Sequence, residues 1–250
     1  MTPPRALRSI RDGLLGLAYP AECRVCSGSV DSWEDGVACA ECWDDPTITK
    51  LLVGDLCTKC GAQLSSGAPT GQHRVCGMCG ALPFTAARAC GSYSGALEAS
   101  ILFLKVNPHI SPRLRALIQR TFAEHRDAIE SEIVIPVPLH KLRERRRGFN
   151  QAAIIAELIA REFNLGYDDG SLVRALATDP HRAGMDATDR ARSVERAFVV
   201  VRPRLIDGAS VLLIDDVLTT GSTISAVTKS LIEAGARQVS VLTVARVTNL

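Results

Sequence analysis

The sequence lacks a long apolar run, a large net charge and an export signal, and each absence excludes a class of protein. Although 46% of the 250 residues are hydrophobic, charged residues interrupt them before any run reaches the roughly 18 to 20 apolar residues that span a bilayer. We therefore expect no membrane insertion. The formal net charge of +2 excludes a polycation that coats nucleic acid over its whole surface, so any anion binding must be local.

The amino terminus superficially resembles a signal peptide, because three arginines precede the short apolar run 14–18. That run is too short for the hydrophobic region of a signal, and Glu22 directly before Cys23 fits neither a secretory nor a lipoprotein cleavage site. We expect a short amphipathic helix there and a cytoplasmic protein. In a reducing compartment, metal binding by the nine cysteines is favoured over disulfides.

Eight of the nine cysteines form four C-x-x-C pairs before residue 85. Two intervening residues let both sulfurs face one ion, and two pairs complete a tetrahedral thiolate site. The predicted ligands, enough for two structural zinc ions, are Cys23, Cys26, Cys39, Cys42, Cys57, Cys60, Cys76 and Cys79. Redox pairs or disulfides are the alternatives, and the sequence does not decide which pairs share an ion. Cys90 is expected in the core, and His73 at the surface.

Composition changes near residue 85, which predicts two domains, 1–83 with the amino-terminal helix and a double zinc ribbon, and 88–250. In the second domain, apolar patterns predict helices that begin near Ser94 and at Ser111, and helices over 151–163 and 223–234. Strands are expected at 133–137, 198–201, 211–214 and 239–244. Strands separated by helices indicate an α/β fold with a parallel sheet covered on both faces.

The most informative stretch is VLLIDDVLTTGST, residues 211–223. An apolar strand ends at two acids, and a turn rich in hydroxyl groups leads into a helix. In an open α/β sheet, ligands bind beyond the carboxyl ends of the strands. The turn offers backbone N–H groups, hydroxyls and a helix amino terminus to a phosphate, and its residues are Thr219, Thr220, Gly221, Ser222 and Thr223.

Asp215 and Asp216 repel phosphate but suit ribose hydroxyls, which donate hydrogen bonds to carboxylates and can share a divalent cation with them. Consecutive strand residues face opposite sides, so both acids reach one sugar only if the chain leaves the strand there. The structural alternative is a strand, turn and capped helix without a ligand. A Walker A loop is excluded, because no lysine follows the glycine, and no G-x-G-x-x-G opens a helix.

A second anion site is indicated by a basic loop between a predicted strand and a predicted helix. Its cations are Lys141, Arg143, Arg145, Arg146 and Arg147. They repel one another unless solvent or an anion neutralises them, and guanidinium groups pair bidentately with phosphate oxygens. A solvated basic loop is the alternative. A nucleic-acid contact is the third, although Phe149 is the one aromatic residue beside it.

The stretch 211–223 resembles the signature of type I phosphoribosyltransferases for 5-phosphoribosyl-1-pyrophosphate (PRPP). The rest of the chain resembles the ComF family of competence-associated proteins, over essentially all 250 residues. The segments that carry the resemblance are 93–105, 135–140 and 147–151, the last being the most specific. The resemblance implies a type I phosphoribosyltransferase-like parallel sheet flanked by helices, preceded by the small zinc-ribbon domain.

By this resemblance, Asp215 and Asp216 hold the ribose of PRPP and its Mg²⁺, and residues 219–223 hold the 5-phosphate. Arg143 and Arg147, with Lys105, take the pyrophosphate. The segment 174–197 corresponds to a lid that closes over the site. The lid departs from the family pattern at Arg182 and Ser193, where glutamine and asparagine are common, and matches it at Arg190 and Ala197.

Two functions follow from these patterns. The first is phosphoribosyl transfer from PRPP to an unknown base or amine with release of pyrophosphate, linked to DNA uptake or nucleotide salvage. The second is a non-catalytic PRPP or nucleotide sensor, or a DNA-uptake accessory, whose zinc ribbons bind a competence-machinery protein or single-stranded DNA. The sequence identifies neither the acceptor nor a general base, and fold resemblance does not establish turnover.

Overall fold

The computed structural model describes residues 21–32, 35–52, 54–64, 74–77, 79–80, 82–175 and 197–247. The predicted amino-terminal helix, His73 and residues 176–196 of the predicted lid lie outside these ranges. Within them, no helix has the length and apolar character that crossing a membrane requires.

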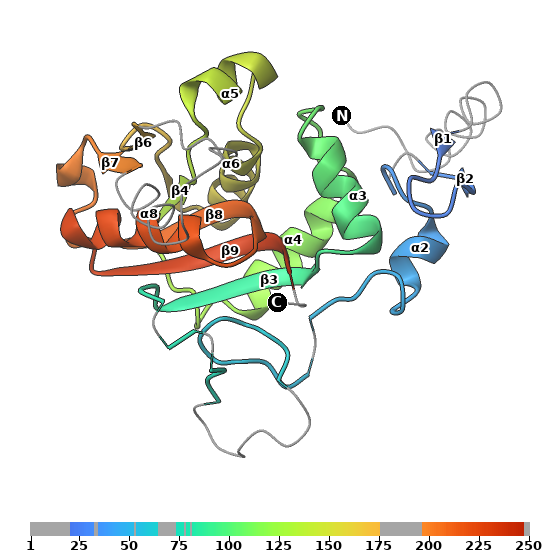
Figure 1. Cartoon of the computed structure of the whole chain (residues 1–250), viewed down its shortest axis with the longest axis horizontal. Coiled ribbons are helices and arrows are strands. Elements are labelled where there is room, and N and C mark those ends of the chain that lie inside the picture. The colour runs from blue at the N-terminus through green and yellow to red at the C-terminus, as the bar shows by residue number, and fades with distance from the viewer. Residues whose placement is uncertain are drawn as a thin grey trace, which may run out of the picture.

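The central element is a sheet of five parallel strands in the order β3-β9-β8-β4-β5 (Figure 1). The strands are β3 (Ala86–Ser92), β9 (Gln238–Arg246), β8 (Ser210–Leu218), β4 (Ile133–Pro136) and β5 (Gly166–Tyr167). Helices connect β3 to β4, β4 to β5 and β8 to β9, as is usual between parallel strands, whereas in the described residues a separate pair of short strands lies between β5 and β8. The predicted α/β fold is therefore confirmed.

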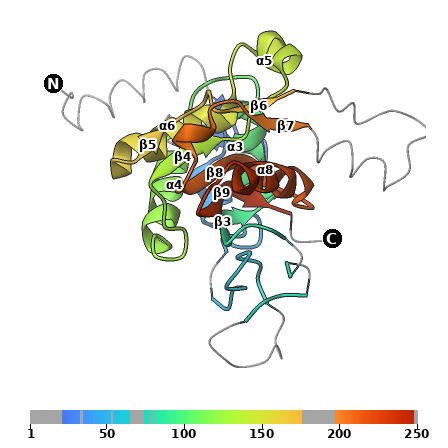
Figure 2. The ribbon, with the colours of Figure 1, turned by 90° about the vertical axis from the view of Figure 1, so that its left-hand side faces the viewer.

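Helices cover both faces of this sheet (Figure 2). They are α3 (Gly95–Leu104), α4 (Pro112–Glu124), α6 (Gln151–Phe163) and α8 (Ser222–Glu233). Side chains of β8 alternate between the two layers, because successive strand residues face opposite sides. Leu212 and Ile214 pack in the layer that contains α3, α4 and α6. Val211 and Leu213 pack in the layer that contains α8.

Local residues cap several helix ends, although Ser94, at the expected start of α3, makes no side-chain hydrogen bond to the helix. Ser111 accepts a hydrogen bond from the Leu114 backbone N–H at 3.3 Å, and proline occupies the first turn of α4. The side chain of Asn150 accepts from the Ala152 N–H at 3.0 Å where α6 begins. Gly235, with φ of +96°, follows the end of α8 in the left-handed conformation expected there.

Two predictions about segments outside the sheet are corrected. The strand expected at 198–201 exists as β7 (Phe198–Val200), but it pairs antiparallel with β6 (Leu172–Arg174) and forms a separate hairpin. The basic loop is a short exposed helix, α5 (Lys141–Arg147), with His140 as its amino-terminal cap and Gly148 as its end. Exposure to water lets the adjacent cations share one helical turn despite their repulsion.

The two cysteine-rich segments lie at different places against the sheet (Figure 1). The first contains the short strands β1 (Ala21–Glu22) and β2 (Ser29–Val30) and the helix α2 (Ala40–Asp44), and it lies beside α3. The second lies below β3 and reaches it through a hydrogen bond of 2.6 Å from the Ala87 N–H to the Lys59 carbonyl. A bridge between Leu51 and Gly91 ties the connecting segment to the same strand.

Candidate functional site

The eight paired cysteines form two clusters of four. The first contains Cys23, Cys26, Cys39 and Cys42, and the second contains Cys57, Cys60, Cys76 and Cys79; within each cluster the sulfurs lie within 4.8 Å of one another. The structure thus shows which pairs share a site. Each cluster could bind a metal ion such as zinc.

The geometry of both clusters fits a tetrahedral metal ion. Sulfur–sulfur distances are 3.8 Å for Cys23–Cys42 and 3.7 Å for Cys26–Cys39, close to the edge of about 3.8 Å that four thiolates at about 2.3 Å from zinc would give. In the second cluster both measured distances are 3.4 Å. All nine cysteines are free thiols, and Cys90 is buried in the core as expected, where burial raises the pKa of its thiol to about 11.

Backbone N–H groups point at the sulfur that leads each cluster. Although burial opposes the shift, hydrogen bonds from the backbone at Cys26 and Cys39 help to lower the pKa of Cys23 to about 6. In the second cluster, backbone N–H groups of Cys60 and Cys76 lower the pKa of Cys57 to about 6 against the same opposing burial. One sulfur in each cluster is therefore stabilised as thiolate, the form that binds a metal ion. Burial and the neighbouring sulfurs raise the pKa of Cys42 and Cys79.

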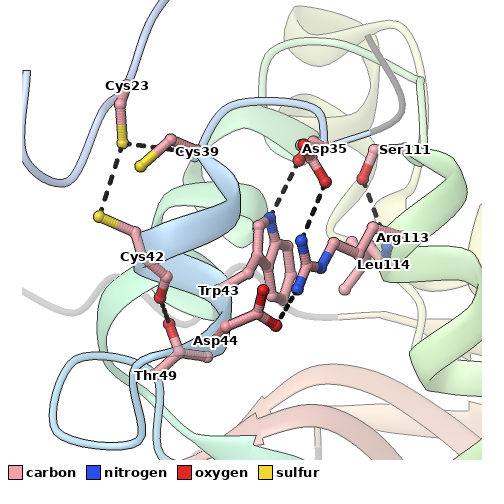
Figure 3. A network of polar contacts seen from close by, with 10 residues as sticks. All are labelled: Cys23, Asp35, Cys39, Cys42, Trp43, Asp44, Thr49, Ser111, Arg113 and Leu114. Carbon is pink, nitrogen blue, oxygen red and sulfur yellow. Dashed lines mark hydrogen bonds and ion pairs between the residues drawn. The ribbon is translucent and has the colours of Figure 1, made fainter. Parts of the chain in front are cut away.

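The first cluster is joined to the α/β domain through Arg113 at the start of α4 (Figure 3). The guanidinium of Arg113 donates to the Asp35 carboxylate at 3.0 Å and also pairs with Asp44. It lies 5.5 Å from the ring centre of Trp43, and the Trp43 indole N–H donates to the Asp35 carbonyl at 3.0 Å. This half-buried cation thus fixes α2 against α4.

The second cluster is joined to the end of β9 through Arg246. The buried guanidinium of Arg246 donates to the Cys60 carbonyl at 2.6 Å and lies 3.5 Å from the Cys60 sulfur. Arg88 on β3 donates to the Thr58 carbonyl at 3.0 Å, so a second buried cation faces the same segment. Positive charges at this place would compensate the negative charge that the thiolates of a metal-bound cluster carry.

Asp215 and Asp216 lie inside β8, which corrects the expectation that the strand ends before them. The strand continues because β9 continues beside it: Asp215 is opposite Thr243, and Leu218 is opposite Arg246. On its other side β4 ends at Pro136, opposite Ile214. The two acids therefore lie where β8 extends past its neighbour, at the carboxyl edge of the sheet.

Because the strand continues, the two acids follow its alternation. Asp216 continues the series of Leu212 and Ile214 and is buried against α3 and α6. Its carboxylate lies 3.4 Å from the Lys105 ammonium, at the end of α3, and accepts from the Gln151 side-chain N–H at 3.2 Å. The structure thus brings together Lys105 and Asp216, two of the predicted site residues.

The Gln151 side chain also accepts a hydrogen bond from the Arg147 guanidinium at 2.6 Å. Arg147, at the end of α5, therefore reaches the acid pair through one glutamine. Arg143, one turn earlier on the same helix, is exposed. Gln151 belongs to the family-like segment 147–151, but its role could not be predicted, since an amide that joins two side chains has no signature in residue spacing.

Asp215 titrates unusually. Burial of its carboxyl group, together with the negative charge of Asp216, raises the pKa of Asp215 to about 8, although Lys105 opposes the shift. The Asp215 side chain also accepts from the Asp216 backbone N–H at 2.9 Å. The pair thus combines an acid compensated by Lys105 with one that retains its proton near neutral pH. Perturbed carboxyl groups of this kind cluster at functional sites.

The turn 219–223 follows β8 directly and is open to solvent at Thr219, Thr220 and Ser222. Gly221 has φ of +78° and precedes the first residue of α8, so the backbone turns sharply into the helix amino terminus. The hydroxyls of Thr220 and Ser222 lie 2.9 Å apart. Hydroxyls and backbone N–H groups at the start of a helix are donors of the kind that can bind a phosphate.

Arg174, at the end of β6, is a cation near the site that the sequence analysis assigned only to the start of the lid. Burial and the positive charge of Arg143 lower the pKa of Arg174, whereas the charge of Asp215 raises it. Arg174 also lines a pocket of about 120 Å³ at the end of β4, together with Pro138, Glu144 and other residues. Positive charge from α5 and β6 therefore flanks the edge where the acids lie.

Comparisons with known proteins match one part of the chain to a domain family and most of its length to several relatives. The family described as "Phosphoribosyl transferase domain" matches residues 150–248. Competence protein F of Haemophilus influenzae is 29% identical over 231 residues, covering 83% of this chain and 96% of its own length. DNA utilization protein YhgH of Escherichia coli O157:H7 is 28% identical, covering 90% and 96%. Competence protein ComFC of Bacillus subtilis is 26% identical, covering 82% and 83%.

Among solved structures, the glutamine PRPP amidotransferase from B. subtilis is similar with a TM-score of 0.37 and 19% identity. The match covers 54% of this chain and 28% of that one, so it spans less than a third of the amidotransferase. Over most of its length the chain is therefore similar to the ComF/YhgH proteins. Its carboxyl-terminal part matches a phosphoribosyltransferase domain, and its amino-terminal part contains the two cysteine clusters.

Proposed function

We propose that this protein binds PRPP with Mg²⁺ at the carboxyl edge of its sheet and transfers the phosphoribosyl group to a base or amine, releasing pyrophosphate. One observation carries the proposal. Two adjacent acids lie where β8 extends past β4, and an exposed turn with hydroxyl groups leads from them into α8. The matched phosphoribosyltransferase domain covers both features.

The turn is suited to the 5-phosphate. The hydroxyls of Thr219, Thr220, Ser222 and Thr223 and the first N–H groups of α8 supply donors, and Gly221 lets the backbone approach the phosphate closely. Asp215 and Asp216 would accept hydrogen bonds from the ribose hydroxyls and supply oxygen ligands to Mg²⁺. Because the side chains of Asp215 and Asp216 point to opposite faces of β8, the sugar would lie across the exposed edge of that strand.

The transfer itself needs charge stabilisation more than covalent chemistry from the protein. The C1–O bond to pyrophosphate breaks, and both electrons leave on oxygen. A lone pair on the acceptor nitrogen forms the C1–N bond, and that nitrogen then loses its proton. Arg147, Arg143 and Lys105 would neutralise the departing pyrophosphate, while the two carboxylates hold the ribose. We also propose that each cysteine cluster holds one structural zinc ion.

Binding without transfer is the second candidate. The names of the relatives, Competence protein F and DNA utilization protein, refer to the use of DNA and not to a transferase. In that case the same pocket would sense PRPP or a nucleotide, and the cysteine-rich segments would bind a competence-machinery protein or single-stranded DNA. Pyrophosphate release separates the two functions. Incubation of the protein with Mg-PRPP and a panel of bases and amines should release pyrophosphate with one acceptor; a sensor binds PRPP and releases none.

The binding proposal is tested by isothermal titration of the full chain with Mg-PRPP. We expect saturable binding by the unaltered protein, and loss of most of that affinity when Asp215→Asn and Asp216→Asn are combined. Inorganic phosphate should still bind weakly to the double variant, because the turn is unchanged. Equal PRPP affinity in both proteins would remove the ribose role of the acids.

A further inference from the structure

Gln151 occupies a fixed position between the two halves of the proposed site. It is the first residue of α6, and 5% of its surface is exposed. The preceding residue, Asn150, caps the helix and also donates its side-chain N–H to the Val137 carbonyl at 3.0 Å. The Gln151 side chain therefore projects from a backbone that is anchored to the end of β4.

The two hydrogen bonds of Gln151 use both ends of its amide. The oxygen accepts from the Arg147 guanidinium at 2.6 Å, and the nitrogen donates to the Asp216 carboxylate at 3.2 Å. A guanidinium only donates and a carboxylate only accepts, so an amide is the side chain that satisfies both without adding a charge. A carboxylate at position 151 would neutralise Arg147 and repel Asp216.

Arg147 thus keeps a positive charge that its glutamine partner does not neutralise. It lies one residue before Gly148, whose φ of +82° ends α5, and its side chain is half-buried. Asp216, by contrast, has the ammonium of Lys105 at 3.4 Å. The glutamine therefore connects a cation available to an anion with an acid that is already compensated.

We propose that Gln151 is a positioning residue that holds Arg147 toward the leaving pyrophosphate while it orients Asp216 toward the ribose. The inference rests on the proposed function and deepens it. An anion that draws Arg147 forward shifts the same amide that restrains Asp216. Binding of pyrophosphate and binding of ribose are thereby coupled through one side chain.

The test compares Gln151→Met with Gln151→Glu in the full chain. Methionine has similar length and helix propensity but forms neither strong hydrogen bond, whereas glutamate keeps an acceptor for Arg147 and adds a negative charge. Gln238→Met is the matched control, because Gln238 donates one hydrogen bond, to the Glu130 carbonyl, at the opposite end of β9. Isothermal titration is carried out with Mg-PRPP and, separately, with magnesium pyrophosphate.

We expect Gln151→Met to weaken both ligands about tenfold, the size of one lost hydrogen bond to a charged group, and Gln151→Glu to weaken pyrophosphate more than Gln151→Met does. Gln238→Met should change neither. In an Arg147→Met background, Gln151→Met should cause no further loss of pyrophosphate affinity, because the glutamine acts there through the arginine. A merely structural role would give the same loss in both backgrounds.

Unchanged affinities in Gln151→Met, or an equal loss with and without Arg147, would overturn the inference. Failure of the proposed function gives a different result. If the unaltered protein binds pyrophosphate with the dependence on Gln151 described above, yet does not bind PRPP, the role of Gln151 toward Arg147 stands, whereas the PRPP site and the role of Gln151 toward the ribose are wrong. If it binds neither ligand, both are wrong.

Discussion

At the scale of single residues, the site depends on a carboxyl group that holds its proton more tightly than a free aspartate. Burial and the charge of Asp216 raise the pKa of Asp215 to about 8. The folded chain therefore binds more protons than the unfolded chain between about pH 4, where a free aspartate titrates, and pH 8. Because the folded state binds this proton more tightly, ionisation of Asp215 lowers the free energy of unfolding as the pH rises through that window.

The same shift predicts how ligand binding depends on pH. The ionised form of Asp215 is the one that accepts hydrogen bonds from ribose hydroxyls, so affinity for Mg-PRPP should increase as the pH rises from 6 to 9 through the pKa of about 8. Titrations at several pH values would check this. Asp215→Asn should bind more weakly and without that increase. An increase that persists in the variant would assign it to another group.

Gly221 offers a second test at this scale, with Gly208 as a matched control. Both glycines have left-handed backbones, with φ of +78° and +74°, and neither place is crowded: an added Cβ at Gly221 would be 3.5 Å from the Leu82 side chain, and at Gly208 it would have no neighbour within 4 Å. Alanine at either position should cost about 1 kcal/mol of unfolding free energy. Phosphate affinity, measured by titration, should fall in Gly221→Ala alone. An equal fall of phosphate affinity in Gly208→Ala would show that the turn at Gly221 has no specific role in binding phosphate.

At the scale of elements, the first cysteine cluster is connected to α3 through a cap supplied from another segment. The residue before α3, Ser94, does not cap the helix with its side chain. Instead the buried Thr49 hydroxyl accepts from the Ala96 N–H at 2.9 Å. The same hydroxyl donates to the Cys42 carbonyl at 2.6 Å (Figure 3). Because α3 ends at Lys105, beside Asp216, the cap ties the metal cluster to an element of the proposed site.

Removing that cap should destabilise the protein. Thr49→Val keeps the shape but loses both hydrogen bonds and leaves the Ala96 N–H without its acceptor, which should cost about 1 to 2 kcal/mol. Denaturant unfolding of the metal-loaded protein measures this cost. Thr49→Ser keeps the hydroxyl and should lose much less. No loss in Thr49→Val would contradict the role of the cap, and a loss in Thr49→Ser as large as that in Thr49→Val would show that packing of the methyl group contributes as much as the hydroxyl.

The elements themselves were largely predictable, because apolar periodicity and capping residues are local. Ser111, Asn150 and Gly235 lie where α4, α6 and α8 begin or end. What the sequence could not indicate depends on neighbours far along the chain. The acids were expected after the end of a strand, yet β9 extends that strand past them, since β8 pairs with it as far as Leu218.

The parts of the candidate site that lie in short motifs were likewise predictable. Residues 211–223 and the cysteine spacing carry chemistry in their order along the chain. The link from Arg147 through Gln151 to Asp216 joins three different elements, and the position of Arg174 depends on a hairpin outside the main sheet. Such contacts follow from packing, which no short motif encodes.

At the scale of the whole molecule, the two cysteine clusters hold the amino-terminal segments to the α/β domain. The first contacts α3 and α4, and the second contacts β3 and β9 through Arg88 and Arg246. The buried cysteines of both segments share their apolar surroundings with the α/β domain, and neither segment has an apolar cluster of its own among the described residues. Metal binding should therefore supply much of their folding free energy.

Metal analysis of the purified protein should find two zinc ions per chain. Cys57→Ser should retain one, since it removes a ligand of the second cluster only. Cys90→Ala is the control, because Cys90 is a buried thiol outside both clusters, and it should retain two. Chelation should lower the midpoint of thermal unfolding in the unaltered protein. Two ions retained by Cys57→Ser would contradict the assignment of that ligand.

The most direct test of the central claim is a crystal structure of the full chain with Mg-PRPP bound. We expect the 5-phosphate against residues 219–223, the ribose hydroxyls within hydrogen-bond distance of Asp215 and Asp216, and the pyrophosphate beside Arg147. PRPP bound elsewhere, with Asp216 still paired with Lys105 and Gln151, would contradict the site proposed for this protein.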